Sequence, residues 1–281
     1  MKQNHIGLLV YLVIVFILIS QGASALEGNA YPKSVVDSAN RSVLIPLPIE
    51  RIIVLNSDAA EAVVTLGAGD KIVAITEATL KRSSHLPGLE NKQVIGSSQM
   101  GGDADYELIA EIAAQGDNSS DLLVVGFSGL GKDYGAQAVE ERLAPFGIVN
   151  VGLDFYQPDN LSREMMVLGE ILEKEEQARS YLDWREEKIQ MIENAVSGLS
   201  SPTVYVERSP KKGLGDLITY GNGSGMQELV RLARGMNIAG ELEKSAHVEW
   251  EWVLIEDPEV IIRTMSSEGA LGWENEPGPD I

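Results

Sequence analysis

Apolar runs with the length and composition of buried strands alternate with helical segments along this chain, and this alternation constrains the fold more than any other feature. Strands are expected at 51–55, 71–75, 122–125 and 148–151, with helices at 59–66, 105–114 and 136–145. Uninterrupted runs of Val, Ile and Leu are typical of strands buried on both faces. The order therefore predicts an α/β fold, with a parallel sheet and helices on both of its faces.

A short β-hairpin is expected ahead of this sheet, within 31–48. Its β-prone runs, 35–36 and 43–45, flank a polar turn. Asn40 lies in that turn and tolerates the left-handed backbone conformation.

The longest periodic segment follows the first sheet. Apolar residues recur at helical spacing from Leu161 to Val196, and a continuous helix of that length would span about 54 Å at about 1.5 Å per residue. Such a helix is longer than one lobe is wide, so a single interlobe helix is expected over 159–198. Two shorter helices, broken near 173–177, are the alternative.

The region after this segment repeats the pattern of the first. Strands are expected at 203–207 and 260–263, and helices at 224–233 and 250–255. Glu107 and Glu251 each precede an apolar strand and lie at the start of a short helix. We therefore expect two pseudo-equivalent α/β lobes, at 31–158 and 201–281.

Residues 1–25 have the pattern of an export signal. Lys2 supplies a positive charge, an apolar run extends from Leu8 to Ile19, and 23–25 has the small residues of a cleavage site. This run would span about 18 Å as a helix, which is short for a hydrocarbon core of about 30 Å. Cleavage would leave Leu26 first, and an uncleaved anchor is the alternative. Either way, the rest of the chain is expected to be extracytoplasmic.

Composition excludes several classes of site and partner. Without cysteine, the chain forms no disulfide, thiolate metal site or lipidated anchor. A formal net charge of -20 opposes binding to nucleic acid or anionic lipid. Beyond the signal the histidines are His85 and His247, in different lobes, so no bare transition-metal site is expected. Four Asn-x-Ser sequons occur, but such triplets arise often by chance and carry little weight here: Asn40, Asn118, Asn160 and Asn222.

The loops after the expected strands hold the candidate ligand-binding residues, because ligands of open α/β sheets bind at the carboxyl ends of strands. These loops combine aromatics, hydroxyls, amides and one arginine, which suits a chelate with polar edges and an organic face. The candidates are Asn56, Ser57, Asp58, Glu77, Ser98, Met100, Phe127, Ser128, Tyr156, Arg208, Tyr220 and Asn222. Ser57 or Asp58 is also expected to cap the helix at 59–66.

Signatures of catalysis are weak. There is no Gly-x-Ser-x-Gly elbow, and the pair Glu140-Glu141 lies on an expected helix surface. The glycines of 126–131 follow a strand, but their order is not that of a dinucleotide-binding loop. We expect no enzyme and no catalytic residue, although the abundance of acids leaves a secreted hydrolase as an alternative.

Several segments, in this order, are similar to those of one protein family. They are Val36–Arg41, Pro46, Glu50–Asn56, Glu61, Leu66–Asp70, Gly223–Asn237 and Trp252–Ile262. They resemble periplasmic binding proteins of the class III type, which serve ABC importers of cobalamin and ferric siderophores. The matches are distributed over 35–263, and the first of them is the most specific.

The resemblance implies two Rossmann-like lobes joined by one long helix, with the ligand in the cleft between them and little lobe movement. The implied function is to deliver an iron–siderophore, haem or cobalamin-like chelate to an ABC permease dimer and its ATPase. Glu107 and Glu251 would dock against arginines of that permease. A monomer without an intrinsic cofactor is expected.

The family usually continues beyond the position of Arg263 with another strand and helices. The second lobe, 201–281, is therefore expected to be incomplete. A secreted surface scaffold or adhesion protein on the same fold is an alternative that a short second lobe favours. Retention of a ligand on gel filtration would separate the importer interpretation from the scaffold and from the hydrolase.

Overall fold

The computed structural model describes residues 31–83, 85–98, 102–129, 135–208 and 217–264. These residues form two compact units. Unit 1 contains the described residues up to Ala60, with Ala68–Leu153 and Val167–Lys174, and unit 2 contains Glu61–Gly67, Asp154–Met166 and the described residues from Glu175 onward. The expected signal segment, Met100 and the residues after Thr264 lie outside the described parts of the chain.

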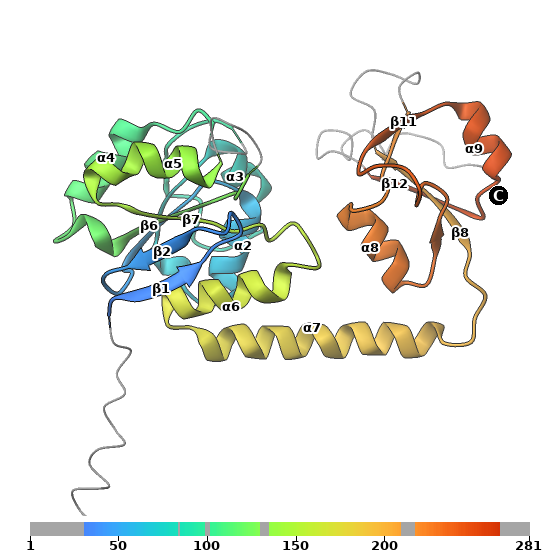
Figure 1. The fold of residues 1–281 in the computed structure, drawn as a ribbon, viewed down its shortest axis with the longest axis horizontal. Coiled ribbons are helices and arrows are strands. Elements are labelled where there is room, and N and C mark those ends of the chain that lie inside the picture. Colours follow the sequence, from blue (N-terminus) through green and yellow to red (C-terminus); the bar gives the residue numbers. More distant parts are fainter. Residues whose placement is uncertain (1–30, 84, 99–101, 130–134, 209–216, 265–281) are drawn as a thin grey trace, which may run out of the picture. The chain divides into compact units, whose positions relative to one another are not determined.

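Unit 1, which contains β6 and β7 in Figure 1, is built on a five-stranded parallel sheet in the order β5-β4-β3-β6-β7. Its strands are β3 (Arg51–Val54), β4 (Ile72–Ile75), β5 (Gln93–Val94), β6 (Leu122–Gly126) and β7 (Val149–Gly152). With β3 counted as the first strand, the order is 3-2-1-4-5, which matches the first five strands of a Rossmann sheet. All five residues of β6 are buried, as its apolar run predicts.

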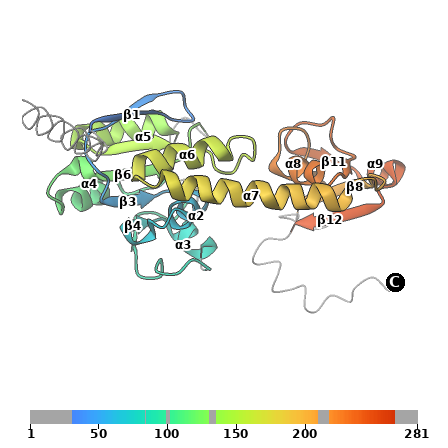
Figure 2. The same cartoon turned by 90° about the horizontal axis from the view of Figure 1, so that it is seen from below.

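Helices cover both faces of this sheet. They are α2 (Ser57–Thr65), α3 (Glu77–Arg82), α4 (Tyr106–Ala114) and α5 (Ala136–Leu143), with short 3-10 helices at η1 (Gly69–Lys71), η2 (Ser119–Asp121) and η3 (Ala144–Phe146). Ile109 of α4 and Val139 of α5 pack with Ile53 and Val124 in one buried core. Helix α3 lies on the opposite face from α5 (Figure 2). The predicted α/β architecture of this region is confirmed.

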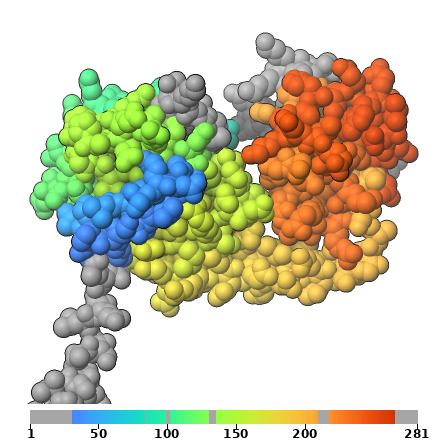
Figure 3. All heavy atoms as spheres, viewed as in Figure 1, coloured from blue at the N-terminus to red at the C-terminus, as the bar shows by residue number. Residues whose placement is uncertain are grey.

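The expected hairpin is present as β1 (Lys33–Val36) and β2 (Ser42–Ile45), which pair antiparallel. Asn40 has φ 58° in the connecting turn, so the left-handed position is the one predicted. The hairpin, drawn in blue, lies beside α6 (Leu161–Leu172) in Figures 1 and 3. Lys33 donates to the carbonyl of Glu170 there, at 3.1 Å.

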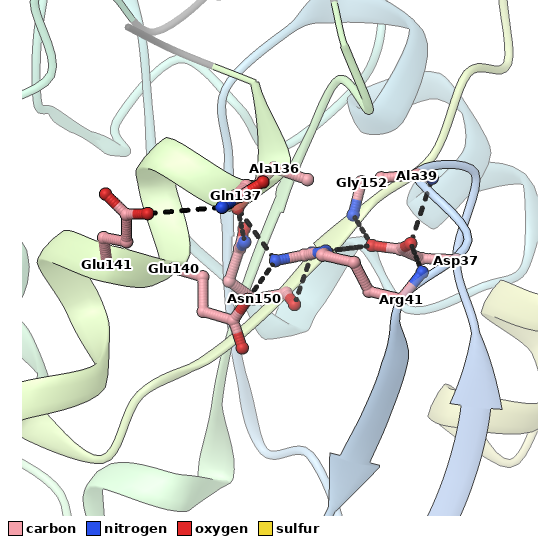
Figure 4. A network of polar contacts seen from close by, with 9 residues as sticks. All are labelled: Asp37, Ala39, Arg41, Ala136, Gln137, Glu140, Glu141, Asn150 and Gly152. Carbon is pink, nitrogen blue, oxygen red and sulfur yellow. Dashed lines mark hydrogen bonds and ion pairs between the residues drawn. The ribbon is translucent and has the colours of Figure 1, made fainter. Parts of the chain in front are cut away.

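A buried ion pair attaches the hairpin to the sheet (Figure 4). Asp37 is fully buried, and its carboxylate accepts hydrogen bonds from Arg41 and from the backbone N–H of Gly152 in β7. Arg41 also donates to the carboxylate of Glu140 on α5, at 2.7 Å. A buried carboxylate is stable only when it is paired and hydrogen-bonded. This ion pair is therefore the structural role of Asp37 and Arg41 in the motif at 36–41.

The expectation of one continuous helix over 161–196 is wrong, and the alternative of two helices is correct. Helix α6 ends at Leu172, and α7 (Glu175–Val196) begins three residues later. Glu173 has φ 58°, and the N–H of Lys174 bonds to the carbonyl of Gly169 at 2.7 Å. A left-handed residue followed by such a bond is the usual C-terminal cap of a helix, with glutamate in the place where glycine is commonest.

Unit 2 is built on a mixed sheet. Its strands are β8 (Thr203–Arg208), β9 (Leu217–Thr219), β10 (Met236–Asn237), β11 (Ala246–Val248) and β12 (Val260–Thr264), and its helices besides α7 are α8 (Gly225–Leu232) and α9 (Trp250–Glu256). Strands β10 and β12 run parallel to β8, whereas β9 runs antiparallel to β8 and to β11. Its small core includes Val206, Val230, Tyr205 and Val253.

The parallel part of this second sheet repeats the connectivity of the first. In unit 1, β3 pairs with β4 and with β6, and α4 leads into β6. In unit 2, β8 pairs with β10 and with β12, and α9 leads into β12, which lies at the border of the sheet (Figure 2). Helices α4 and α9 therefore hold equivalent places. Among the described residues, no helix combines the length and hydropathy needed to cross a bilayer.

Candidate ligand-binding site

A cavity of about 620 Å³ lies in unit 2. Four parts of unit 2 line it, namely the loop before α6, the loop between β9 and α8, α8 itself, and Lys244 in the loop between β10 and β11. The lining residues are Tyr156, Gln157, Pro158, Asp159, Tyr220, Asn222, Gly223, Ser224, Gly225, Met226, Gln227, Glu228, Leu229, Arg231 and Lys244. A volume of several hundred Å³ is typical of sites for organic ligands.

The loop between β9 and α8 is folded tightly by its glycines and by Ser224. A Cβ atom on Gly221 would lie 2.3 Å from the carbonyl oxygen of Glu243, so only glycine fits there. The Ser224 hydroxyl donates to the carbonyl of Gly221 and accepts from the N–H of Gln227, which caps α8. This arrangement fixes the start of α8 and leaves Asn222 exposed at the cavity.

The opposite wall comes from the loop before α6. Tyr156 is 39% exposed, and its hydroxyl accepts a hydrogen bond from Gln157 at 3.0 Å. A Cβ on Gly225 would meet the carbonyl oxygen of Tyr156 at 3.6 Å, an ordinary contact, so the loop packs closely on the first turn of α8. Two tyrosines, Tyr156 and Tyr220, therefore belong to the wall of one cavity.

The charged groups of the wall are balanced. The carboxylate of Glu228 pairs with the guanidinium of Arg231, and this hydrogen bond lowers the pKa of Glu228. Arg231 is also attracted to Asp159, and Lys244 supplies a second cation. With two acids and two bases, the wall offers donors and acceptors for a polar ligand without a strong overall preference for one sign of charge.

Three of the residues that the sequence singled out, Tyr156, Tyr220 and Asn222, are brought together at this cavity. Arg208 ends β8, where its backbone pairs with Ile218, and it is not part of the lining. Met100 lies outside the described residues.

Asn56, Ser57 and Asp58 lie at the carboxyl end of β3 in unit 1. Asn56 is fully buried, and its side-chain oxygen accepts from the N–H of Ala59 at 2.8 Å, so Asn56 caps α2 and the expected caps, Ser57 and Asp58, were wrong. Burial raises the pKa of Asp58, against the opposing effects of the Ser57 hydroxyl and the charge of Arg82. Of the three, Asp58 alone has an appreciably exposed side chain.

The other candidates of unit 1 follow β4, β5 and β6 at the same edge of the sheet. Glu77 is exposed and pairs with Lys81 at 2.8 Å, while the backbone N–H of Ser98 donates to the carboxylate of Asp103. Phe127 is buried, and Ser128 is half-buried. These residues share an edge, as predicted, but none of them lines the cavity of unit 2.

The two expected docking glutamates lie in equivalent positions. Glu107 is in the first turn of α4, and Glu251 is in the first turn of α9; both are exposed. Asp105 caps α4 by accepting from the N–H of Leu108 at 2.9 Å, so Glu107 is not needed for that role.

Sequence reasoning missed the contribution of α8 and of Lys244 to the site. The available signal was the Gly-Asn-Gly-Ser-Gly run at 221–225, which predicts a tight turn followed by a capped helix whose first residues face the same space as the turn. Lys244 gives no such signal, because it reaches the cavity through the backbone pairing of Gly221 with its carbonyl.

The model of the periplasmic binding protein family matches residues 52–280. The chain belongs to this family. Among curated proteins, none matches the sequence. Of the described residues, no group of three or more His, Cys, Asp or Glu side chains is arranged to hold a metal ion.

Solved structures of periplasmic binding proteins share the fold. A periplasmic solute-binding protein from Veillonella parvula is 22% identical, with 82% of this chain and 68% of that one covered and a TM-score of 0.62. The haem-binding protein HmuT is 18% identical over 89% of this chain and 78% of its own, with a TM-score of 0.64. The molybdate-binding protein MolA from Haemophilus influenzae is 20% identical over 82% and 73%, also with a TM-score of 0.64.

Proposed function

We propose that this periplasmic binding protein is the extracytoplasmic solute-binding component of an ABC importer, and that it holds a metal chelate of the iron–siderophore, haem or cobalamin type. The observation that carries the proposal is the cavity of unit 2, with two tyrosines and mixed polar and apolar walls. A bare oxyanion would leave most of about 620 Å³ unfilled. An organic chelate fills such a volume and brings its own metal.

The wall offers specific chemistry to such a ligand. Phenol oxygens of Tyr156 and Tyr220 are suited to hydrogen-bonding a chelate or to coordinating ferric iron, as tyrosine does in some haem proteins. Arg231 and Lys244 are suited to carboxylate groups on the ligand periphery. The apolar atoms of Met226 and Leu229 give contact to its organic face.

Ligand-dependent stabilisation tests the proposal. At one hundred times its dissociation constant, a cognate chelate adds about 2.7 kcal/mol, which is a melting shift of roughly 5–10 °C for a chain of this size. The measurement is a thermal melt of the purified protein against ferric siderophores, haem and corrinoids. A folded sample that none of these shifts would contradict the proposal and favour a scaffold on the same fold.

Matched variants locate the site. Tyr156→Phe, Tyr220→Phe and Arg231→Gln should each weaken binding about tenfold, which corresponds to about 1.4 kcal/mol. Arg234→Gln is the control, because Arg234 is exposed and does not line the cavity. Equal losses in Arg231→Gln and Arg234→Gln would place the ligand elsewhere.

A further inference from the structure

We infer that Asn118 is an N-glycosylation site, the one of the four sequons that the fold leaves suited to carry a glycan. The inference rests on the proposed extracytoplasmic location, because N-glycosylation acts on exported chains. All four sequons satisfy the sequence rule, so the structure has to distinguish them by what a glycan would meet at each asparagine.

Asn222 and Asn160 are poor positions for a glycan. Asn222 lines the cavity of unit 2, where an attached sugar would occupy the space proposed for the ligand. Asn160 is half-buried, and its side-chain nitrogen donates to Gln157 at 3.4 Å. A glycan is bulky and hydrophilic, and it is attached through the side-chain nitrogen of asparagine. At Asn222 it would fill the cavity, and at Asn160 it would replace the hydrogen bond to Gln157.

Asn40 is exposed, but it lies beside the candidate binding loops of unit 1. The turn that contains it is held against the carboxyl end of β7, since the N–H of Ser38 donates to the carbonyl of Gly152 at 2.9 Å. Asn40 also has φ 58°, and its neighbour Arg41 belongs to the buried ion pair with Asp37. A glycan there would crowd both the sheet edge and this pair.

Asn118 combines exposure with a fixed, extended backbone. It has φ -151° and ψ 130°, and its side-chain oxygen accepts from the N–H of Ser120 at 2.9 Å. Its carbonyl and the carboxylate of Asp121 accept hydrogen bonds from Arg51, which also caps the end of α4 through the carbonyl of Ile112. The loop is therefore held from its inner side, while the Asn118 side chain remains exposed at the surface.

The position of Asn118 beside the sheet of unit 1 keeps a glycan away from the proposed contacts of that unit. The residue lies directly before β6, at the amino edge of the parallel sheet, where the N–H of Glu50 donates to the carbonyl of Asp121. The candidate ligand residues of unit 1 follow the strands at the opposite, carboxyl edge, and Glu107 lies toward that edge because α4 starts after β5 and ends before this loop. Glycosylation here would leave the candidate residues of unit 1 and Glu107 accessible, and Asn118 is not among the residues that line the cavity of unit 2.

The reaction requires a lipid-linked oligosaccharide donor in addition to the transferase. The side-chain nitrogen of Asn118 forms a bond to the anomeric carbon of the sugar, and the bond from that carbon to the phosphate oxygen of the lipid carrier breaks. The lipid phosphate or diphosphate leaves, and the amide nitrogen loses one proton. No oxidation or reduction is involved.

Mass spectrometry of protein purified from its native host tests the inference. Trypsin releases residues 93–132 as one peptide, whose one sequon is that of Asn118. We expect this peptide to carry a glycan mass on most molecules. Ser120→Ala removes the sequon and should abolish the modification, whereas Ser119→Ala and Ser120→Thr keep it and should retain the modification. Ligand affinity should be the same in Asn118→Gln as in the unaltered protein.

Two outcomes separate failure of this inference from failure of the proposed function. Protein that is recovered outside the cytoplasm with an unmodified 93–132 peptide would overturn the glycosylation site alone, as would a modification that survives Ser120→Ala. Protein that is retained in the cytoplasm would contradict the proposed location, and this inference with it.

Discussion

Among the described residues, four other than glycine have a left-handed backbone, and each one ends an element or turns the chain. They are Asn40, Glu173, Arg234 and Asp257. Glu173 and Arg234 follow α6 and α8, at the position after a helix where glycine is commonest. Because glutamate and arginine are good helix formers, the sequence predicts continuation where the structure has an end.

Arg234→Gly is expected to stabilise the protein. Arg234 is exposed with φ 58°, and the N–H of Gly235 already bonds to the carbonyl of Val230 at 2.8 Å, so the cap geometry is in place. Glycine removes the strain of a Cβ atom in the left-handed conformation, but it also gives the unfolded chain more conformational freedom. The net effect should be an increase of about 1 kcal/mol in the free energy of unfolding. Thermal melts should show a higher midpoint for Arg234→Gly and no rise for Arg234→Ala, which keeps the Cβ.

Tyr205 makes the stability of unit 2 sensitive to alkali. Its ring is fully buried, its hydroxyl has no hydrogen-bond partner among the described residues, and burial, with a further contribution from Glu207, raises its pKa to about 12. The folded state holds this proton more tightly than the unfolded state, whose tyrosine pKa is about 10. The resulting contribution to the free energy of unfolding is therefore complete below pH 10 and is lost as the pH rises from 10 to 12.

Tyr205→Phe should therefore flatten the alkaline limb of the stability curve. At neutral pH the variant should be as stable as the parent or slightly more so, because an unpartnered buried hydroxyl is removed. Denaturant titrations at pH 7, 10 and 11 measure both effects. An equal alkaline loss in parent and variant would mean that another group titrates in this range.

At the scale of elements, the strands that contain apolar runs could be predicted from the sequence, whereas the short strands that depend on pairing with a neighbour could not. Strands β3, β4, β6 and β8 each contain a run of three or more apolar residues, so their positions could be predicted from these runs. Strands β9, β10 and β11 have two or three residues each and are strands only because β8 or β9 pairs with them. Such short segments carry no periodicity, and two of them, β9 and β11, are the part of unit 2 that departs from a parallel sheet.

The candidate site also has a part that the sequence predicts and a part that depends on the folded structure. Tyr156, Tyr220 and Asn222 were found because they stand in loops next to strands or helices. Asn56 was selected by the same rule, but its side chain turns inward to cap α2, and a loop position does not distinguish a cap from a ligand contact. Which loops share one cavity depends on pairings such as that of Gly221 with Lys244, which join residues far apart in the chain.

The equivalent places of α4 and α9 lead to a prediction about docking. Glu107 and Glu251 are both exposed in a first turn, where a carboxylate is favoured by the helix dipole by about 0.3–1 kcal/mol. If each pairs with arginines on one half of a permease dimer, losing a buried interfacial pair would cost roughly 2–5 kcal/mol of binding. The double variant Glu107→Ala, Glu251→Ala should keep its ligand affinity and melting temperature and lose most transport with its own permease.

Glu111→Ala combined with Glu256→Ala provides the matched control, since both residues are exposed acids later in the same two helices. This control has the same change in net charge and should transport normally. Normal uptake by the Glu107, Glu251 variant would show that these residues only favour the starts of their helices.

At the scale of the whole molecule, the described residues of the two units form cores of unequal size. The core of unit 1 joins residues from three strands, β3, β4 and β6, and two helices, α4 and α5, with Ile53, Ile109 and Val124 fully buried in it. The core of unit 2 is divided into two small clusters on the two faces of β8, one around Val206 and one around Tyr205. Separate cores permit separate unfolding transitions, because cooperativity requires shared packing.

Two matched core variants test whether the units unfold separately. Val124 in β6 and Val206 in β8 are both fully buried valines of central strands, one in each unit. Truncation to alanine should cost about 2 kcal/mol at either site. In calorimetry, Val206→Ala should lower the earlier of two transitions and leave the later one in place, since unit 2 has the smaller core, and Val124→Ala should lower the later one. A ligand that occupies the cavity of unit 2 should raise only the transition that Val206→Ala lowers. If both variants instead shift one common transition by equal amounts, the two cores unfold as one cooperative structure.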